Sequence, residues 1–325
     1  MACAVSRISR KLVEETRPRM LSYLLRRLVL TIPVLLGVAT LVFSLLHLVP
    51  GDPAQSMLGE AAAAADVEEL RSRLGLDKPL PRQYADFMMG VARFDLGTSF
   101  RYNTKVSKEI GSRLRNTMLL AVCAMAVALT IALPLGIIAA TFRGKLADHV
   151  AMTLALVGIS MPNFWLGPLL AILLSVKLGW LPVSGTGSVA HLVLPAVTLG
   201  AALAAILARM TRASLLVELR ELYVLAARAR GLSRLRVVLR HAFRNSLIPI
   251  VTIIGLQFGA VLTGTIITET IFAWPGVGRL LIQSISFRDY PLVQGCILFI
   301  SIVYVGVNLL TDLAYGWLDP RIRYE

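Results

Sequence analysis

Long apolar runs recur along this chain and are separated by shorter polar segments. A helix needs roughly 20 apolar residues to cross the hydrocarbon core of a bilayer, and several runs reach or approach that length. Six of them stand out, at residues 28–49, 118–140, about 150–176, 192–208, 247–267 and 291–314. The pattern therefore predicts an all-α integral membrane protein with about six transmembrane helices.

Prolines interrupt several of the predicted helices. Pro134 and Pro195 fall in the second and fourth runs, and Pro162 and Pro168 fall in the third. A proline removes one backbone hydrogen bond, which a membrane helix tolerates where neighbouring helices or water satisfy the freed carbonyl. Such kinks suit either plain helix packing or a moving transport pathway. We take Pro162 as a candidate for the pathway.

Composition supports a membrane location. Hydrophobic residues make up 56% of the chain, charged residues make up 16%, and the mean hydropathy is +0.72. Soluble domains usually carry about a quarter charged residues. A net charge of +14 would favour nucleic-acid binding in a soluble protein, but here the basic residues gather between apolar runs. We therefore expect membrane lipid, and no nucleic acid, as a partner.

The distribution of basic residues predicts the orientation. Segment 209–244 contains nine arginines against Glu218 and Glu221, and segment 142–149 carries Arg143 and Lys145. With six spans, both segments lie on the same side of the membrane as the two termini. Cytoplasmic loops of membrane proteins are enriched in Lys and Arg. Both termini are therefore expected to be cytoplasmic.

The chain divides into four predicted regions. Residues 1–19 lack the apolar segment of a signal peptide, and we expect a disordered or variable N-terminal extension there. Residues 20–50 hold the first transmembrane helix. Residues 51–114 form a small extracytoplasmic subdomain, and residues 115–325 form a core of five further transmembrane helices.

The extracytoplasmic subdomain is predicted to be helical. Residues Val67–Leu74 and Leu80–Val91 both have amphipathic patterns, and Gly75 is a plausible C-cap of the first. The subdomain is too short to bury a large core of its own, so it is expected to pack on the membrane part.

The basic stretch 209–244 is too long for a simple turn. It lacks proline and its only glycine is Gly231, which predicts two helices broken at that residue, the first spanning Ala213–Arg230 and the second beginning near Ser233. Ala226, Ala227 and Ala229 would give the first helix a face with little side-chain bulk, which another protein could approach closely. The alternative is a solvated basic loop that only sets the topology.

Catalytic and cofactor motifs are missing from the sequence. There is no GxxxxGK[ST] phosphate loop, so neither ATP nor any other cofactor is expected on this chain, and the histidines and cysteines do not form a metal-binding pattern. An ion-coupled secondary transporter should carry charged residues at the membrane midplane, and an intramembrane enzyme needs a catalytic pair at one depth. Neither pattern is visible. Ionisable residues near the spans are therefore notable, and Glu269 is a candidate for an outer gate.

Several motifs resemble one transporter family. The segment from Tyr223 to Gly231, Tyr-Val-Leu-Ala-Ala-Arg-Ala-Arg-Gly, resembles the cytoplasmic coupling loop of bacterial ABC-transporter permeases of the dipeptide/oligopeptide/nickel family. Other motifs match in order and spacing from about Met20 to the end, which is typical of the first permease of the pair. They include Pro50-Gly-Asp-Pro53, Asp95-Leu-Gly97, Glu269-Thr-Ile-Phe-Ala-Trp-Pro-Gly-Val-Gly278 and Arg288-Asp-Tyr-Pro291.

The resemblance implies a type I ABC importer fold and a location in the bacterial cytoplasmic (inner) membrane. It implies a second homologous permease, two ATP-binding subunits that hold ATP and Mg, and an extracytoplasmic substrate-binding protein as partners. Ala226, Ala227 and Gly231 would shape the coupling helix and its turn, and Arg228 and Arg230 would be its polar contacts. Leu225 stands where the general coupling-loop pattern has glutamate, which leaves the polar contact with the ATPase open.

The resemblance leaves the cargo less defined. Family members carry dipeptides, oligopeptides, glutathione, nickel chelates and related solutes. The regions around Gly179–Pro182 and Gln257 favour the glutathione and dipeptide branches, and Gln257 is therefore a further pathway candidate. A nickel-chelate importer of the same family is the alternative.

Overall fold

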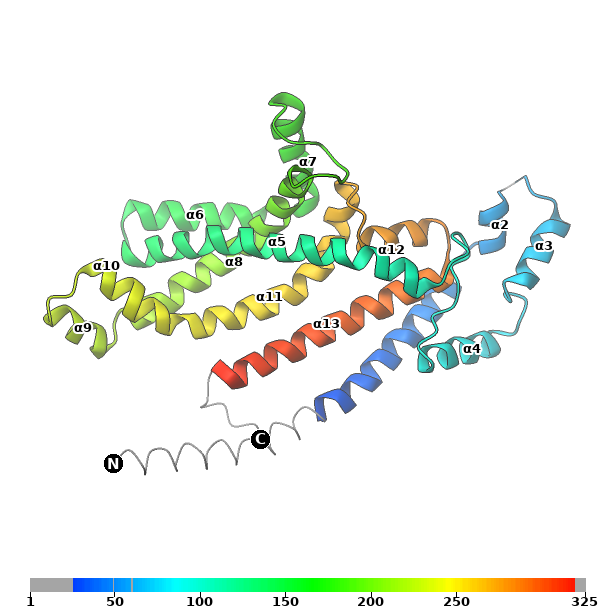
Figure 1. The fold of residues 1–325 in the computed structure, drawn as a ribbon, viewed down its shortest axis with the longest axis horizontal. Helices are drawn as coiled ribbons and strands as arrows, with labels where there is room; N and C mark the ends of the chain where they lie inside the picture. The colour runs from blue at the N-terminus through cyan, green and yellow to red at the C-terminus, as the bar shows by residue number, and fades with distance from the viewer. Residues whose placement is uncertain (1–25, 49, 60, 319–325) are drawn as a thin grey trace.

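The structure is a computed structural model that describes residues 26–48, 50–59 and 61–318. Within these ranges the regular elements are helices (Figure 1). The first helix spans Arg26–Leu48. The others are α2 (Pro53–Leu58), α3 (Ala64–Arg73), α4 (Leu80–Ala92), α5 (Val106–Thr141), α6 (Leu146–Ser160), α7 (Asn163–Leu170), η1 (Ala171–Lys177), α8 (Ala190–Glu218), α9 (Leu222–Ala229), α10 (Arg234–Arg236), η2 (Val237–Ala242), α11 (Phe243–Ile271), α12 (Val277–Ser286) and α13 (Tyr290–Leu318).

The predicted all-α membrane architecture is confirmed. Five helices of the described chain are long and apolar enough to cross a membrane, and the number rises to six if one bent pair is counted as a single span. The spanning helices run longer than the apolar runs predict. For example, α5 begins at Val106 rather than near residue 118, because its first turns carry charged residues that hide the helix start. The predicted extension 1–19 and the C-terminal tail beyond residue 318 lie outside the described residues.

The third predicted span is sharply bent, at one of the prolines noted in the sequence. The chain bends by 104° between α6 and the continuous pair α7–η1. Pro162 lies at the bend as the extended residue before α7, and a proline there cannot continue the hydrogen bonds of α6. The start of α6 lies beside Arg212 of α8. The loop after η1 contacts the end of α11, where the Gly185 amide donates to the Phe272 carbonyl at 2.9 Å.

The core lies where α5, α8 and α11 pack together, with α6 against α8 (Figure 1). Its buried residues are mainly alanine and leucine. A Cβ at Gly200 would meet the Ala124 carbonyl of α5, and one at Gly136 would meet Thr211 of α8. Membrane helices usually associate through small residues that let their backbones approach closely and make van der Waals contacts. The hydrophobic effect does not drive helices together inside a bilayer, because the lipid tails are as apolar as the side chains. The two glycines therefore fix the contact between α5 and α8.

Two ends can be distinguished along the helix bundle. The end that carries α9, α10 and segment 142–149 is called the basic end below, and the end that carries α2, α3, α4 and α12 is called the distal end (Figure 1). The start of the first helix and the end of α13 lie together, since Arg27 pairs with Asp312 at 3.0 Å.

The distal end contains the predicted helical insertion. Both expected helices are present as α3 and α4, and Gly75 follows α3 with φ of +69°, the left-handed conformation that favours glycine. The short α2 adds to them. Asp52 caps α2 by accepting from the Ala54 amide and also pairs with Arg71 of α3 at 2.5 Å. The Pro-Gly-Asp-Pro motif thus joins the first two helices of the insertion.

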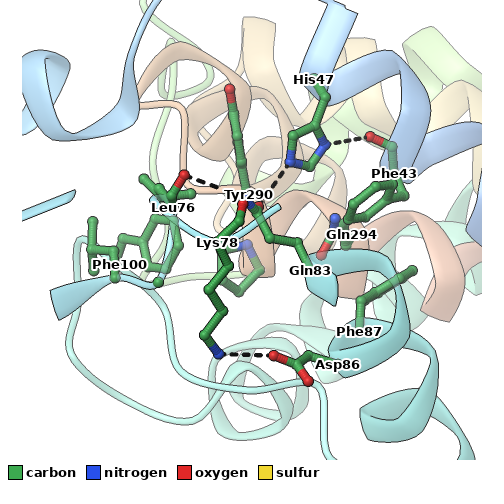
Figure 2. Close-up of a pocket in the computed structure, with 13 residues that line it drawn as sticks. Phe43, His47, Leu76, Lys78, Gln83, Asp86, Phe87, Phe100, Tyr290 and Gln294 are labelled. Atoms are coloured by element: carbon green, nitrogen blue, oxygen red, sulfur yellow. Dashed lines mark hydrogen bonds and ion pairs between the residues drawn. The ribbon is translucent and has the colours of Figure 1, made fainter. Parts of the chain in front are cut away.

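The insertion is anchored to the first helix through His47 (Figure 2). Nδ1 of His47 lies 2.8 Å from the Phe43 carbonyl oxygen, and Nε2 lies 3.1 Å from Oε1 of Gln83 on α4. The Gln83 amide nitrogen donates to the carbonyls of Leu76 and Lys78, which fixes the linker between α3 and α4. These groups border a cavity of about 260 Å³ that also touches α13. His47 therefore serves as an attachment point for the insertion.

Candidate coupling surface at the basic end

The basic stretch is helical, as the sequence predicts, but its first helix is broken where the sequence predicts a continuous one. The expected helix Ala213–Arg230 does not exist as one unit, because α8 continues to Glu218 and a tight turn separates it from α9. On the other side, α10, η2 and α11 run on from Arg234 as one long helix. Only residues 219–233 lie outside the long helices. This segment, called the coupling segment below, protrudes from the bundle at the basic end (Figure 1).

Gly231 ends α9, as the sequence predicts. Its φ is +78°, and the Gly231 amide donates to the Arg228 carbonyl at 2.9 Å while the Leu232 amide donates to the Ala227 carbonyl at 3.4 Å. This pairing closes the end of a helix and requires a left-handed residue after it. A Cβ added at Gly231 would meet open space. The glycine is therefore needed for its backbone conformation and not for lack of room. Ser233 then begins the next helix in an extended conformation.

The inner face of α9 is held against the bundle by a small apolar cluster. Val224 and Ala227 of α9 are buried against Leu215 of α8, Ala140 of α5 and Val237 of η2. Ala227 therefore faces inward, and the predicted shared face of Ala226, Ala227 and Ala229 is wrong in this respect. Burial of Val224 and Ala227 fixes how α9 lies on the ends of α5 and α8.

The outer face of α9 is exposed and largely apolar. Leu222 is 79% exposed and Leu225 is 52% exposed, and Ala226 and Ala229 lie on the same open side. Arg228 and Arg230 flank this face and are also exposed. An exposed apolar patch rimmed by charge is typical of an interaction site.

Tyr223 links the coupling segment to α8. Its hydroxyl donates to Glu218 at 2.5 Å. Burial, helped by the neighbouring carboxylate, raises the pKa of Tyr223 to about 12. The phenol therefore stays protonated at physiological pH and keeps this hydrogen bond.

A buried ion pair braces the basic end beneath α9. Arg212 of α8 donates to both carboxylate oxygens of Asp148 at the start of α6, at 2.7 and 2.8 Å. The Gly144 amide also donates to Asp148 at 2.9 Å, so the loop between α5 and α6 joins the pair. Sequence reasoning counted Arg212 only as one of nine arginines, because the pattern does not reveal which of them meets the single acid of segment 142–149.

Glu269 lies at the distal end in a buried hydrogen-bonded turn. Its side chain is inaccessible to solvent. Oε1 accepts from the Thr117 hydroxyl of α5 at 2.7 Å, and Oε2 accepts from the Arg279 amide in the first turn of α12 at 3.0 Å. Thr117 in turn accepts from the Val277 amide at 2.8 Å. Glu269 therefore ties α11, α12 and α5 together.

The motif that follows Glu269 completes this turn. Trp274 is buried and its indole donates to the Asn116 carbonyl at 3.0 Å, while the Asn116 amide donates back to the Pro275 carbonyl at 3.0 Å. Gly276 and Gly278 pass so close to Glu269 that a Cβ on either would clash with it. The buried carboxyl group of Glu269 thus explains why glycine occupies positions 276 and 278 of this motif. Thr117, its main partner, carries no sequence signal that would identify it.

The structure does not bring the pathway candidates together. Pro162 is exposed at the bend before α7, and Glu269 is buried at the distal end of α11. Gln257 lies on α11, partly buried, and its side-chain nitrogen has no partner within the described part of the chain. The coupling residues, in contrast, all lie on or directly after α9.

Two family descriptions match the chain over most of its length. Residues 132–324 match the binding-protein-dependent transport system inner membrane component, and residues 20–121 match the N-terminal part of such membrane components. The chain therefore belongs to the family of inner membrane components of binding-protein-dependent transport systems and is a multi-pass permease subunit.

Similar proteins narrow the class to ABC permeases. The glutathione transport system permease protein GsiC of Pectobacterium atrosepticum is 47% identical over 306 residues, covering 94% of this chain and 100% of that protein. The dipeptide transport system permease protein DppB of Escherichia coli K12 is 44% identical over 338 residues, covering 94% of this chain and 100% of that protein.

A solved structure shares the fold. A chain of the MetNI methionine ABC transporter, in an inward-facing conformation, matches with a TM-score of 0.55 at 17% identity, over 65% of this chain and 96% of that chain. The likeness confirms the predicted ABC importer permease fold.

Proposed function

We propose that this chain forms half of the channel of an ATP-driven importer for small peptides, of the dipeptide or glutathione kind. The two relatives that match nearly the whole chain are named for those cargoes. A second permease, two ATPase subunits and an extracytoplasmic binding protein complete the transporter, with the basic end in the cytoplasm. ATP and Mg bind the ATPase subunits.

The observation that carries the proposal is the exposed face of α9. In a chain whose motifs lack a phosphate loop, the energy of ATP must enter through a contact. Leu222, Leu225 and Ala226 offer an apolar surface at the tip of the bundle, with Arg228 and Arg230 beside it. The inner face of α9 packs on α5 and α8. A displacement of α9 by the ATPase would therefore move these core helices with it as a rigid body.

Leu225 defines the chemistry of this contact. Where the general coupling pattern has a glutamate, this chain presents a half-exposed leucine. The groove of the matching ATPase is therefore expected to be apolar at this position and acidic around Arg230.

Uptake by proteoliposomes tests the proposed function. Vesicles that contain both permeases, both ATPase subunits and the binding protein should accumulate radiolabelled dipeptide or glutathione when ATP is present with the ATPase subunits. Uptake that follows an ion gradient and needs no ATPase subunit would contradict it. Uptake of nickel chelates but not of peptides would support the alternative cargo within the same family.

Substitution of Gly231 should uncouple ATP hydrolysis from uptake. Gly231→Val forces a β-branched residue into the left-handed region, at a cost of about 1–2 kcal/mol or more, and so disturbs the end of α9. We expect ATP hydrolysis to continue while uptake per ATP falls several-fold. Gly231→Asn is the matched control, since asparagine tolerates this conformation and a Cβ here meets open space. Normal uptake by the valine variant at normal expression would exclude this role.

A further inference from the structure

Two cavities adjoin at the basic end, beside α10. The first has a volume of about 210 Å³ and is lined by four arginines. They come from separate elements: Arg143 follows α5, Arg220 follows α8, Arg228 lies on α9 and Arg234 lies on α10. Four positive charges therefore converge on one small space.

These arginines lack acidic partners. Among the described residues, no carboxylate forms an ion pair with any of the four, whereas the neighbouring Arg212 is fully engaged by Asp148. Arg234 alone is fixed, by a 2.5 Å hydrogen bond to the Thr141 carbonyl at the end of α5. Like charges that gather without a counter-charge repel one another, and a bound anion relieves that repulsion.

The second cavity is apolar and joins the first. It has a volume of about 320 Å³ and is lined by Ile137, Ile138, Phe142, Leu235 and Val238. Thr141, Arg234 and Val238 border both cavities. Ile137 and Ile138 belong to the last turns of the spanning helix α5, which is where a spanning helix is expected to leave the acyl-chain region.

From this juxtaposition we infer a binding site for an anionic phospholipid, with its headgroup phosphate among the arginines and an acyl chain in the apolar groove. The inference rests on the proposed function only for its placement of the basic end at the cytoplasmic surface. A free phosphate would fill the arginine cavity and leave the groove empty, and an acidic segment of the ATPase would do the same. A lipid matches both parts at once.

The site has a consequence for coupling. The headgroup would contact residues from α5, α8, α9 and α10, which lie on both sides of the break at Gly231. A bound lipid would therefore brace the coupling segment against the core. Membranes without anionic lipid would leave the coupling segment less well held.

Lipid retention by the purified, assembled transporter tests the site. After exchange into detergent with equal phosphatidylglycerol and phosphatidylcholine, native mass spectrometry should find phosphatidylglycerol retained selectively. The double variant Arg143→Gln, Arg220→Gln should weaken retention on the order of 25-fold, because each arginine near an anionic headgroup contributes about five-fold. Arg143→Lys, Arg220→Lys should keep most of it, which separates lost charge from lost folding.

The matched control is the double variant Arg236→Gln, Arg240→Gln, which removes the same charge from exposed positions on α10 and η2 that line neither cavity. Equal loss in the control, or equal retention of phosphatidylcholine, would overturn the site. So would displacement of the lipid by millimolar inorganic phosphate. Loss of the ATPase subunits from the Gln variant with lipid retention unchanged would assign the arginines to the ATPase instead. Lipid retention needs no ATP. If the transporter retains phosphatidylglycerol but fails to take up peptide, the result would count against the proposed function and not against the lipid site.

Discussion

Arg212→Ala is expected to destabilise the permease by about 3–5 kcal/mol, the usual cost of leaving one partner of a buried ion pair alone. Asp148 is only 4% exposed, so its carboxylate would lose its counter-charge and two hydrogen bonds with little water to replace them. The pair joins α6 to α8, so its loss should loosen the basic end first. Thermal unfolding of the purified chain in detergent measures the effect.

The matched substitution Asp148→Asn should cost clearly less. Arg212 is 29% exposed and can turn its charge toward water, and the asparagine oxygen can still accept from the Gly144 amide. Arg212→Met combined with Asp148→Asn should recover most of the lost stability, because no buried charge remains. If the two single variants lose equal stability, and the loss in the double variant equals the sum of the two, the two residues are not energetically coupled. That result would contradict the assignment of the ion pair.

Glu269→Ala is expected to have the second large effect, a loss of about 3–5 kcal/mol. The change deletes a fully buried side chain and leaves a cavity. It also orphans the Thr117 hydroxyl and the Arg279 amide, and a buried donor without an acceptor costs about 1–3 kcal/mol. The turn from Ala273 to Gly278 should become accessible, which protease digestion from the distal side of oriented vesicles would detect.

Glu269→Gln separates this structural role from a gate. Glutamine fills the same space, and its oxygen can still accept from the Arg279 amide. Its nitrogen cannot accept from Thr117, so the Thr117 hydroxyl loses its present acceptor. We expect a stability loss of about 1–3 kcal/mol, smaller than that of Glu269→Ala, and transport near normal. A glutamine variant that folds normally yet loses transport would instead favour the outer-gate hypothesis that the sequence suggests for this residue.

The spanning helices could be predicted because lipid imposes a strong rule on sequence. Each run must be apolar for about 20 residues, so the five spanning helices appear in the pattern. Helices α3 and α4 could be predicted for a different reason, the spacing of apolar residues along one face. Gly231 could be predicted as a helix end for a similar local reason, since the left-handed position after a helix favours glycine.

The remaining features depend on contacts between distant residues. The bend at Pro162 is 104°, but Pro134 lies within α5 and Pro195 within α8, so a proline alone does not tell a broken helix from a continuous one. Ala226 and Ala227 are adjacent in sequence, but neighbouring residues of a helix point about 100° apart. The packing of α9 on Leu215 and Val237 buries Ala227 and leaves Ala226 exposed. Asp148 and Thr117 acquire their roles only once α8 and α12 come to lie beside them.

Ala226 is exposed and Ala227 is buried, and this difference gives the most direct test of the coupling surface. In a transporter assembled from otherwise cysteine-free subunits, Ala226→Cys should cross-link to the ATPase subunit with a short bifunctional thiol reagent, and ATP should change the yield. Ala227→Cys is the control, because Ala227 is 7% exposed and faces the cluster beneath α9. Efficient linking at residue 226 with little at residue 227 is the predicted result. Equal linking at both residues, or linking at neither while the transporter pumps normally, would contradict the assignment of α9 as the coupling helix.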